Sequence, residues 1–125
     1  MRHTVKMHGV IVGHSDLESA DESLGRAWGA FRPGLGYELV QPVFRLFSQA
    51  VPTRGGEPRD DFTLARYHAA RDKLALDLVD ANGNQIETTT IHIADYLDED
   101  GSLELDVLIR DDEYWSARQD GPCAE

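Results

Sequence analysis

Cysteine, long apolar runs and basic charge are all scarce in this chain of 125 residues. The single cysteine, Cys123, has no partner for an internal disulfide, which favours the reducing cytoplasm over an oxidising compartment. No apolar stretch approaches the ~20 residues that a membrane-spanning helix needs. We therefore expect a single cytoplasmic domain over residues 1–125, with a frayed tail over residues 118–125.

The shortage of basic residues is uneven along the chain. Lysine and arginine total 12 against 23 acidic residues, which gives a net charge of -11. Residues 1–63 are nearly balanced, with seven basic and eight acidic side chains, whereas residues 64–125 contain five basic and fifteen acidic ones. Because phosphate binding relies on lysine and arginine, this balance argues against nucleic acid and against an anionic membrane as direct ligands. It favours a basic protein surface as the partner, unless the carboxylates only form a solvated face.

Two segments have the apolar spacing of helices. Between residues 37 and 51 the apolar side chains recur every three or four positions, which predicts the main helix of the protein. Pro42 either begins this helix or kinks a longer one. A second helix is expected over residues 60–71, with Asp60 or Asp61 as its N-cap. Ser15 and Glu18 match a capping box, which predicts a short helix after the first strand.

Other segments alternate like strands. Residues 4–12 and 27–31 are expected to form strands, and three more are expected over residues 74–79, 85–96 and 103–110. The Asn-Gly dipeptide at residues 82–83 and the turn at residues 98–101 would join the last three into an antiparallel meander. The predicted fold class is α+β, an antiparallel sheet of about five strands covered on one face by one or two helices. Its expected core consists of Leu74, Leu76, Leu78, Leu103, Leu105, Val107 and Ile109 packed against Val40, Phe44 and Phe47.

Motifs for metal binding and catalysis are missing. The five histidines form no close pair, and no cysteine pair supports them, so we expect no metal site and no cofactor. Gly13-His14-Ser15 resembles a nucleophile elbow only in part, because Leu17 stands where the second glycine is needed. We therefore predict no catalytic residue.

The acidic C-terminal region, from residue 95 to residue 115, is the first candidate site. It combines carboxylates with two adjacent aromatic side chains, which suits docking to a basic protein surface unless Trp115 packs back onto the sheet. The predicted function is a small acidic binding protein, comparable by charge alone with immunity-type proteins or nucleic-acid mimics. The predicted docking residues are Asp98, Asp100, Asp111, Asp112, Tyr114 and Trp115.

A pocket is the alternative site. It would lie near the glycine-rich segment that contains Trp28, and it would belong to a small-molecule-binding protein or a small enzyme. Its polar groups would come from His8, His14, Asp16 and His92. Convergence of these side chains would favour this alternative over a docking face.

Overall fold

Two antiparallel sheets and three α-helices make up the protein in the computed structural model, which describes residues 2–53 and 56–120. The helices are α1 (Tyr37–Ala50), α2 (Asp61–Asp72) and α3 (Asp112–Asp120), with a short 3-10 turn, η1 (Glu22–Leu24). The five-stranded sheet has the order β5 (Arg32–Pro33), β2 (Val10–Ser15), β1 (His3–Met7), β6 (Leu76–Val79), β7 (Gln85–Ile86). The four-stranded sheet has the order β3 (Ser19–Asp21), β4 (Arg26–Ala30), β9 (Ser102–Ile109), β8 (Thr88–Tyr96). The predicted α+β class is confirmed, although the strands divide between two sheets.

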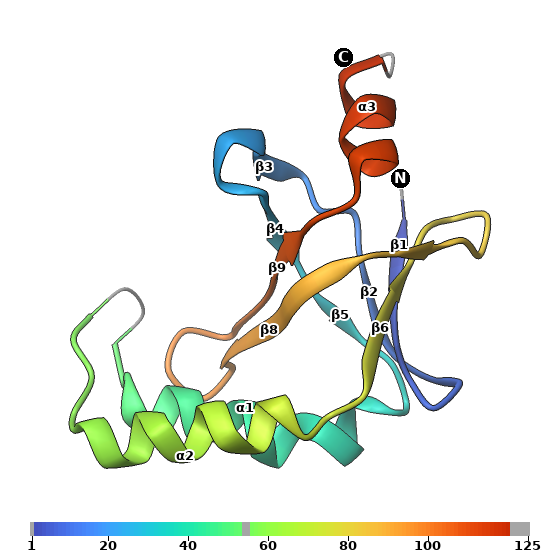
Figure 1. Cartoon of the computed structure of the whole chain (residues 1–125). Coiled ribbons are helices and arrows are strands. Elements are labelled where there is room, and N and C mark those ends of the chain that lie inside the picture. The colour runs from blue at the N-terminus through green and yellow to red at the C-terminus, as the bar shows by residue number, and fades with distance from the viewer. Residues whose placement is uncertain (1, 54–55, 121–125) are drawn as a thin grey trace.

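The helices lie at two ends of the molecule. α1 and α2 run side by side beneath the sheets, whereas α3 lies at the opposite end, beside the N-terminus (Figure 1). Of the tail expected over residues 118–125, residues 118–120 instead form the last part of α3, and residues 121–125, with Cys123, lie outside the described residues. Within residues 2–53 and 56–120, no helix has the length and apolar character needed to cross a membrane.

The first predicted strand is in fact a hairpin. Met7 pairs with Val10, so a two-residue turn of His8 and Gly9 separates β1 from β2. Both turn residues have positive φ, 50° and 81°, as the tight type I′ turn requires. The prediction of one strand over residues 4–12 was wrong because histidine, unlike asparagine, is a weak signal for this turn.

The capping-box helix is also absent. Ser15 ends β2 and is buried, and its Oγ accepts a hydrogen bond from the Leu17 amide at 3.0 Å. Leu17 adopts a φ of 45° and buries its side chain completely, after which the chain continues into β3. The prediction was wrong because a serine hydroxyl bonds to a nearby backbone amide in turns as well as at helix N-termini.

The two long helices are confirmed. α1 begins at Tyr37, so Pro42 lies inside it, on an exposed position where its missing N–H leaves the Glu38 carbonyl without its helical donor. α2 is capped by Asp60, whose Oδ1 accepts from the Thr63 amide at 2.6 Å.

The predicted meander divides between the two sheets. The Asn-Gly turn joins β6 to β7 as expected, with Gly83 at a φ of 86°. The chain then leaves the first sheet at Glu87, and β8 pairs with β9 in the second sheet. The segment predicted as one strand over residues 85–96 therefore contributes to both sheets.

The core lies where both sheets meet α1. Val5, Val12 and Leu78 enter it from the first sheet, and Ile93 and Leu105 enter it from the second. Most of the expected core is confirmed: Leu78, Leu105, Val107, Ile109, Val40 and Phe44 are buried. Four of its expected members are only partly buried around it, namely Leu74, Leu76, Leu103 and Phe47.

Candidate functional site

The predicted docking residues lie in two separate places. Asp98 and Asp100 belong to the turn between β8 and β9, whereas Asp111 and Asp112 lie at the start of α3. β9 runs between these places, and a strand of eight residues spans about 26 Å. One partner surface of ordinary size can cover both, but they are not a single cluster.

The aromatic pair at the α3 end is part of the structure rather than of an open face. Trp115 is only 8% exposed, and its Nε1 donates to the Ile109 carbonyl at 3.1 Å. Tyr114 packs edge-on against His3 and accepts from Arg118 Nη1 at 2.9 Å. The role of Trp115 as a docking anchor is therefore corrected: its ring fills the core, because the short α3 folds back over the end of β9.

Asp111 also has a structural role. Its Oδ1 accepts from the amides of Glu113 and Tyr114, at 3.1 and 3.3 Å, and its Oδ2 accepts from the Glu87 amide at 3.2 Å. It thus satisfies amides at the start of α3 and ties that helix to the segment between β7 and β8. Asp112 is exposed beside it.

The β8–β9 turn presents the other carboxylates. Asp98, Glu99 and Asp100 are all exposed. Asp98 Oδ2 accepts from Arg45 Nη1 at 3.1 Å, and Asp100 Oδ1 accepts from the Ser102 amide at 2.9 Å. We call Asp98, Glu99 and Asp100 the acidic turn.

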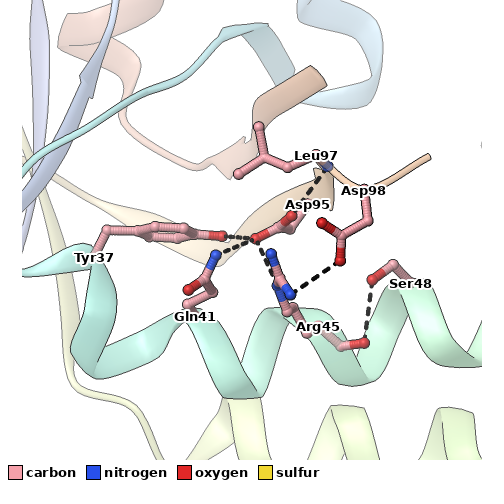
Figure 2. A network of polar contacts seen from close by, with 7 residues as sticks. All are labelled: Tyr37, Gln41, Arg45, Ser48, Asp95, Leu97 and Asp98. Atoms are coloured by element: carbon pink, nitrogen blue, oxygen red, sulfur yellow. Dashed lines mark hydrogen bonds and ion pairs between the residues drawn. The ribbon is translucent and has the colours of Figure 1, made fainter. Parts of the chain in front are cut away.

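Directly beneath the acidic turn lies a buried carboxylate, that of Asp95, which is 2% exposed (Figure 2). Its Oδ2 accepts from Tyr37 Oη at 2.7 Å and from Gln41 Nε2 at 3.2 Å, and Arg45 Nε lies 3.6 Å away. Its Oδ1 accepts from the Leu97 amide at 3.2 Å. The same guanidinium of Arg45 therefore joins Asp95 to the acidic turn.

These contacts keep Asp95 ionised. Burial alone would raise its pKa, but hydrogen bonds from Tyr37, Gln41 and the Leu97 amide, together with Arg45, outweigh burial and lower the pKa below its ordinary value. Burial and the bond to Asp95 raise the pKa of the Tyr37 hydroxyl, so this group keeps its proton.

Sequence reasoning missed this network, although one signal was present. Tyr37, Gln41 and Arg45 are spaced four residues apart, which places three polar groups on one face of α1. Nothing local indicated that these three side chains would contact Asp95, which lies at least fifty residues further along the chain.

A cavity of about 260 Å³ opens between the acidic turn and the C-terminal end of α1. The residues that line it include Asp95, Asp98, Glu99, Arg45 and Arg59. This volume is below the ~300–1,000 Å³ usual for a small-molecule site. It matches the end of one long side chain better than a whole cofactor.

The residues of the alternative pocket are only partly brought together. His8 is exposed in the β1–β2 turn, His14 lies on β2 with its Nδ1 3.0 Å from Thr4 Oγ1, and Asp16 pairs with Arg32 at 3.4 Å. Trp28 and His92 belong to the other sheet. Neither the cavity of about 260 Å³ nor a second one of about 190 Å³ is lined by any of these five residues.

Trp28 and His92 do share one face of the four-stranded sheet. Both pair in register with Asp106 of β9, so the three side chains form a row across β4, β9 and β8. Arg26 joins the row through two donors to Asp106, the shortest at 2.6 Å, and its guanidinium lies 4.2 Å from the centre of the Trp28 ring. The side chains of this row therefore contact one another, and they line neither of the two cavities described.

His92 is built into the helix–sheet contact. Its ring lies 4.5 Å from that of Phe47, centre to centre, and its Nδ1 is hydrogen-bonded to Tyr67 Oη. Burial lowers the pKa of His92 to about 4, with smaller contributions from the charges of Arg71 and His68 and an opposing one from Asp106. Burial raises the pKa of Tyr67 to about 12.

Stability is expected to fall between about pH 7 and about pH 5 because of His92. Its pKa is about 4 when folded and 6.5 when unfolded, so the unfolded chain binds the extra proton in this window. Linkage then removes about 2 kcal/mol of the free energy of unfolding by pH 5. Urea unfolding at several pH values measures this loss, and His92→Gln should remove most of it. An unchanged pH dependence in His92→Gln would contradict the assignment.

Within residues 2–53 and 56–120, no three histidine, cysteine or acidic side chains converge in a way that could hold a metal ion. Comparison of the chain with protein-family models, curated proteins and solved structures finds no match.

Proposed function

We propose that the protein is a small acidic binding protein that docks a basic protein surface through the acidic turn and the cavity beside it. The observation that carries this proposal is that two exposed residues of the acidic turn, Asp98 and Glu99, line a cavity sized for one side chain. The reducing cytoplasm is the compartment we propose, since the chain has a single cysteine.

The cavity favours a cationic side chain. Three acidic residues and two arginines line it, and the C-terminal end of α1 adds the partial negative charge of its last carbonyls. Arg45 already neutralises part of this negative charge, because it forms an ion pair with Asp98 at the surface. An incoming lysine or arginine would compete for Asp98, whose side chain is 73% exposed, and not for the buried Asp95.

The small-molecule alternative around Trp28, His14 and His92 has less support. His14 lies on a different sheet from the other two, and the row of Trp28, Asp106 and His92 lines neither cavity.

Charge reversal tests the docking proposal. Reversing Asp98, Glu99 and Asp100 to lysine is expected to slow association with a basic partner, captured from native lysate and purified, by tenfold or more at low salt. Dissociation should change little, because packed contacts set it. Surface plasmon resonance at low and high salt measures both rates.

The matched control changes the net charge equally at the other end of β9, through Glu87→Lys, Asp112→Lys and Glu113→Lys. It should slow association much less than the reversal of the acidic turn. Equal slowing by both variants would show that total charge matters rather than this site. A lysate from which the protein captures no basic partner would count against the proposal itself.

A further inference from the structure

An exposed apolar surface lies at the N-terminal end of α1, away from the acidic turn. Val10 and Ile11 of β2 are 44% and 43% exposed, Leu39 of α1 is 61% exposed, and Leu35, in the loop before α1, is 98% exposed. We call these four residues the apolar corner. Single exposed apolar side chains are common, but several gathered around one loop indicate an interaction surface.

Close contacts bring the loop before α1 against β2, and the Leu39 amide, which donates to the Gly36 carbonyl at 3.1 Å, joins the first turn of α1 to the same loop. Gly34 N donates to the Val12 carbonyl at 2.7 Å and Gly36 N donates to the Ile11 carbonyl at 3.0 Å, so the loop lies against β2. A Cβ on Gly36 would be 2.5 Å from the Ile11 carbonyl oxygen and 2.8 Å from Val10 Cγ1. Only glycine allows this approach, which brings the loop onto the two exposed side chains of β2.

The same bonds hold Leu35 in place. The glycine on each side of it is hydrogen-bonded to β2, and the Tyr37 amide donates to the Gly34 carbonyl at 3.1 Å. A leucine side chain is therefore presented to solvent on a fixed loop. Binding through such a pre-organised group loses less conformational entropy than binding through a free loop.

The charges around the apolar corner complement each other. Glu38 is exposed next to Leu39, and Lys6 faces Ile11 in the β1–β2 register. Within residues 2–53 and 56–120, neither Lys6 nor Glu38 forms an ion pair. Asp77, which also pairs with Lys6 in register, instead accepts from Gln85 Nε2 at 3.1 Å.

We infer that the apolar corner is the interface between two copies of this chain. In a two-fold dimer the apolar corner of one subunit packs against the apolar corner of the other. Lys6 of each subunit can then face Glu38 of the other, which gives two ion pairs across the axis. The protein has a net charge of -11, so most of its surface repels a second copy. The apolar corner differs, because one charge of each sign lies beside it. The acidic turns stay free at the far end of each α1, so such a dimer presents two of them.

Sedimentation equilibrium of the untagged protein tests the inference. The wild type is expected to associate into dimers with a Kd well below about 1 mM, and Leu35→Asp is expected to weaken the dimer at least tenfold. Phe62→Asp is the matched control, since Phe62 is 73% exposed but lies on α2. It should dimerise like the wild type. A wild type that stays monomeric, or equal effects of the two variants, would overturn the inference.

A charge swap distinguishes a second copy from any other apolar partner. Lys6→Glu should weaken the dimer, and adding Glu38→Lys to it should restore much of the lost affinity, because the exchanged charges meet again across the two-fold axis. Circular dichroism checks that each variant stays folded. A double variant no tighter than Lys6→Glu alone would overturn the symmetric arrangement.

Discussion

Replacing Phe44 by alanine is expected to lower the free energy of unfolding by about 3 to 5 kcal/mol. Phe44 is completely buried, and its ring lies near those of Tyr67 and His92, with centroid distances of 6.3 and 6.2 Å. The truncation opens a cavity where α1, α2 and β8 meet, and rings held from three elements cannot easily close it. Urea unfolding measures the loss.

Phe62→Ala serves as the control for this change. The same residue type is truncated there on the exposed side of α2, where the cost should stay within about 0.5 kcal/mol. A cost for Phe44→Ala no larger than that of Phe62→Ala would show that α1 packs in a different register.

Replacing Asp95 by alanine is expected to cost a similar amount, about 3 to 5 kcal/mol. The variant leaves the Tyr37 hydroxyl and the Gln41 amide without their acceptor, and it leaves Arg45 beside a buried gap. Such orphaned buried donors are more costly than the loss of the bond itself. Thermal or urea unfolding at neutral pH measures the effect.

Asp98→Ala is the matched control three positions along the chain. Its carboxylate also pairs with Arg45 but is 73% exposed, so its loss should change stability by no more than about 1 kcal/mol. The contribution of Asp95 is expected to persist above the ordinary aspartate pKa and to disappear as the pH falls through its lowered folded pKa. Equal losses for the two variants would contradict the buried role of Asp95.

Local patterns predicted the elements well where one physical cause dominates. The apolar spacing of α1 and the Asp60 cap of α2 depend on residues within one or two turns, and both are confirmed. Ser15 shows the limit of such signals. Its hydroxyl makes the expected kind of bond to a nearby amide, but without an apolar stripe behind it the bond closes a turn and not a helix.

The pairing of strands that are far apart in the chain could not be predicted from local sequence patterns. Residues 85–96 are rich in strand-favouring threonine and isoleucine, and nothing local shows that the chain changes sheets at Glu87. The choice between β6 and β9 as a hydrogen-bonding neighbour depends on contacts made far along the chain. The candidate site follows the same rule: the acidic turn was predicted, whereas the Tyr37, Gln41 and Arg45 contacts to Asp95 join α1 to a distant strand.

The position of β1 between β2 and β6 also affects the order of events during synthesis. β2 can pair with β1 as soon as the hairpin leaves the ribosome, but the other edge of β1 pairs with β6, which follows both long helices. Such distant pairing slows folding, and it leaves a strand edge open to other chains in the meantime. The nascent hairpin of β1 and β2 is thus open to pairing with other chains until β6 has been made.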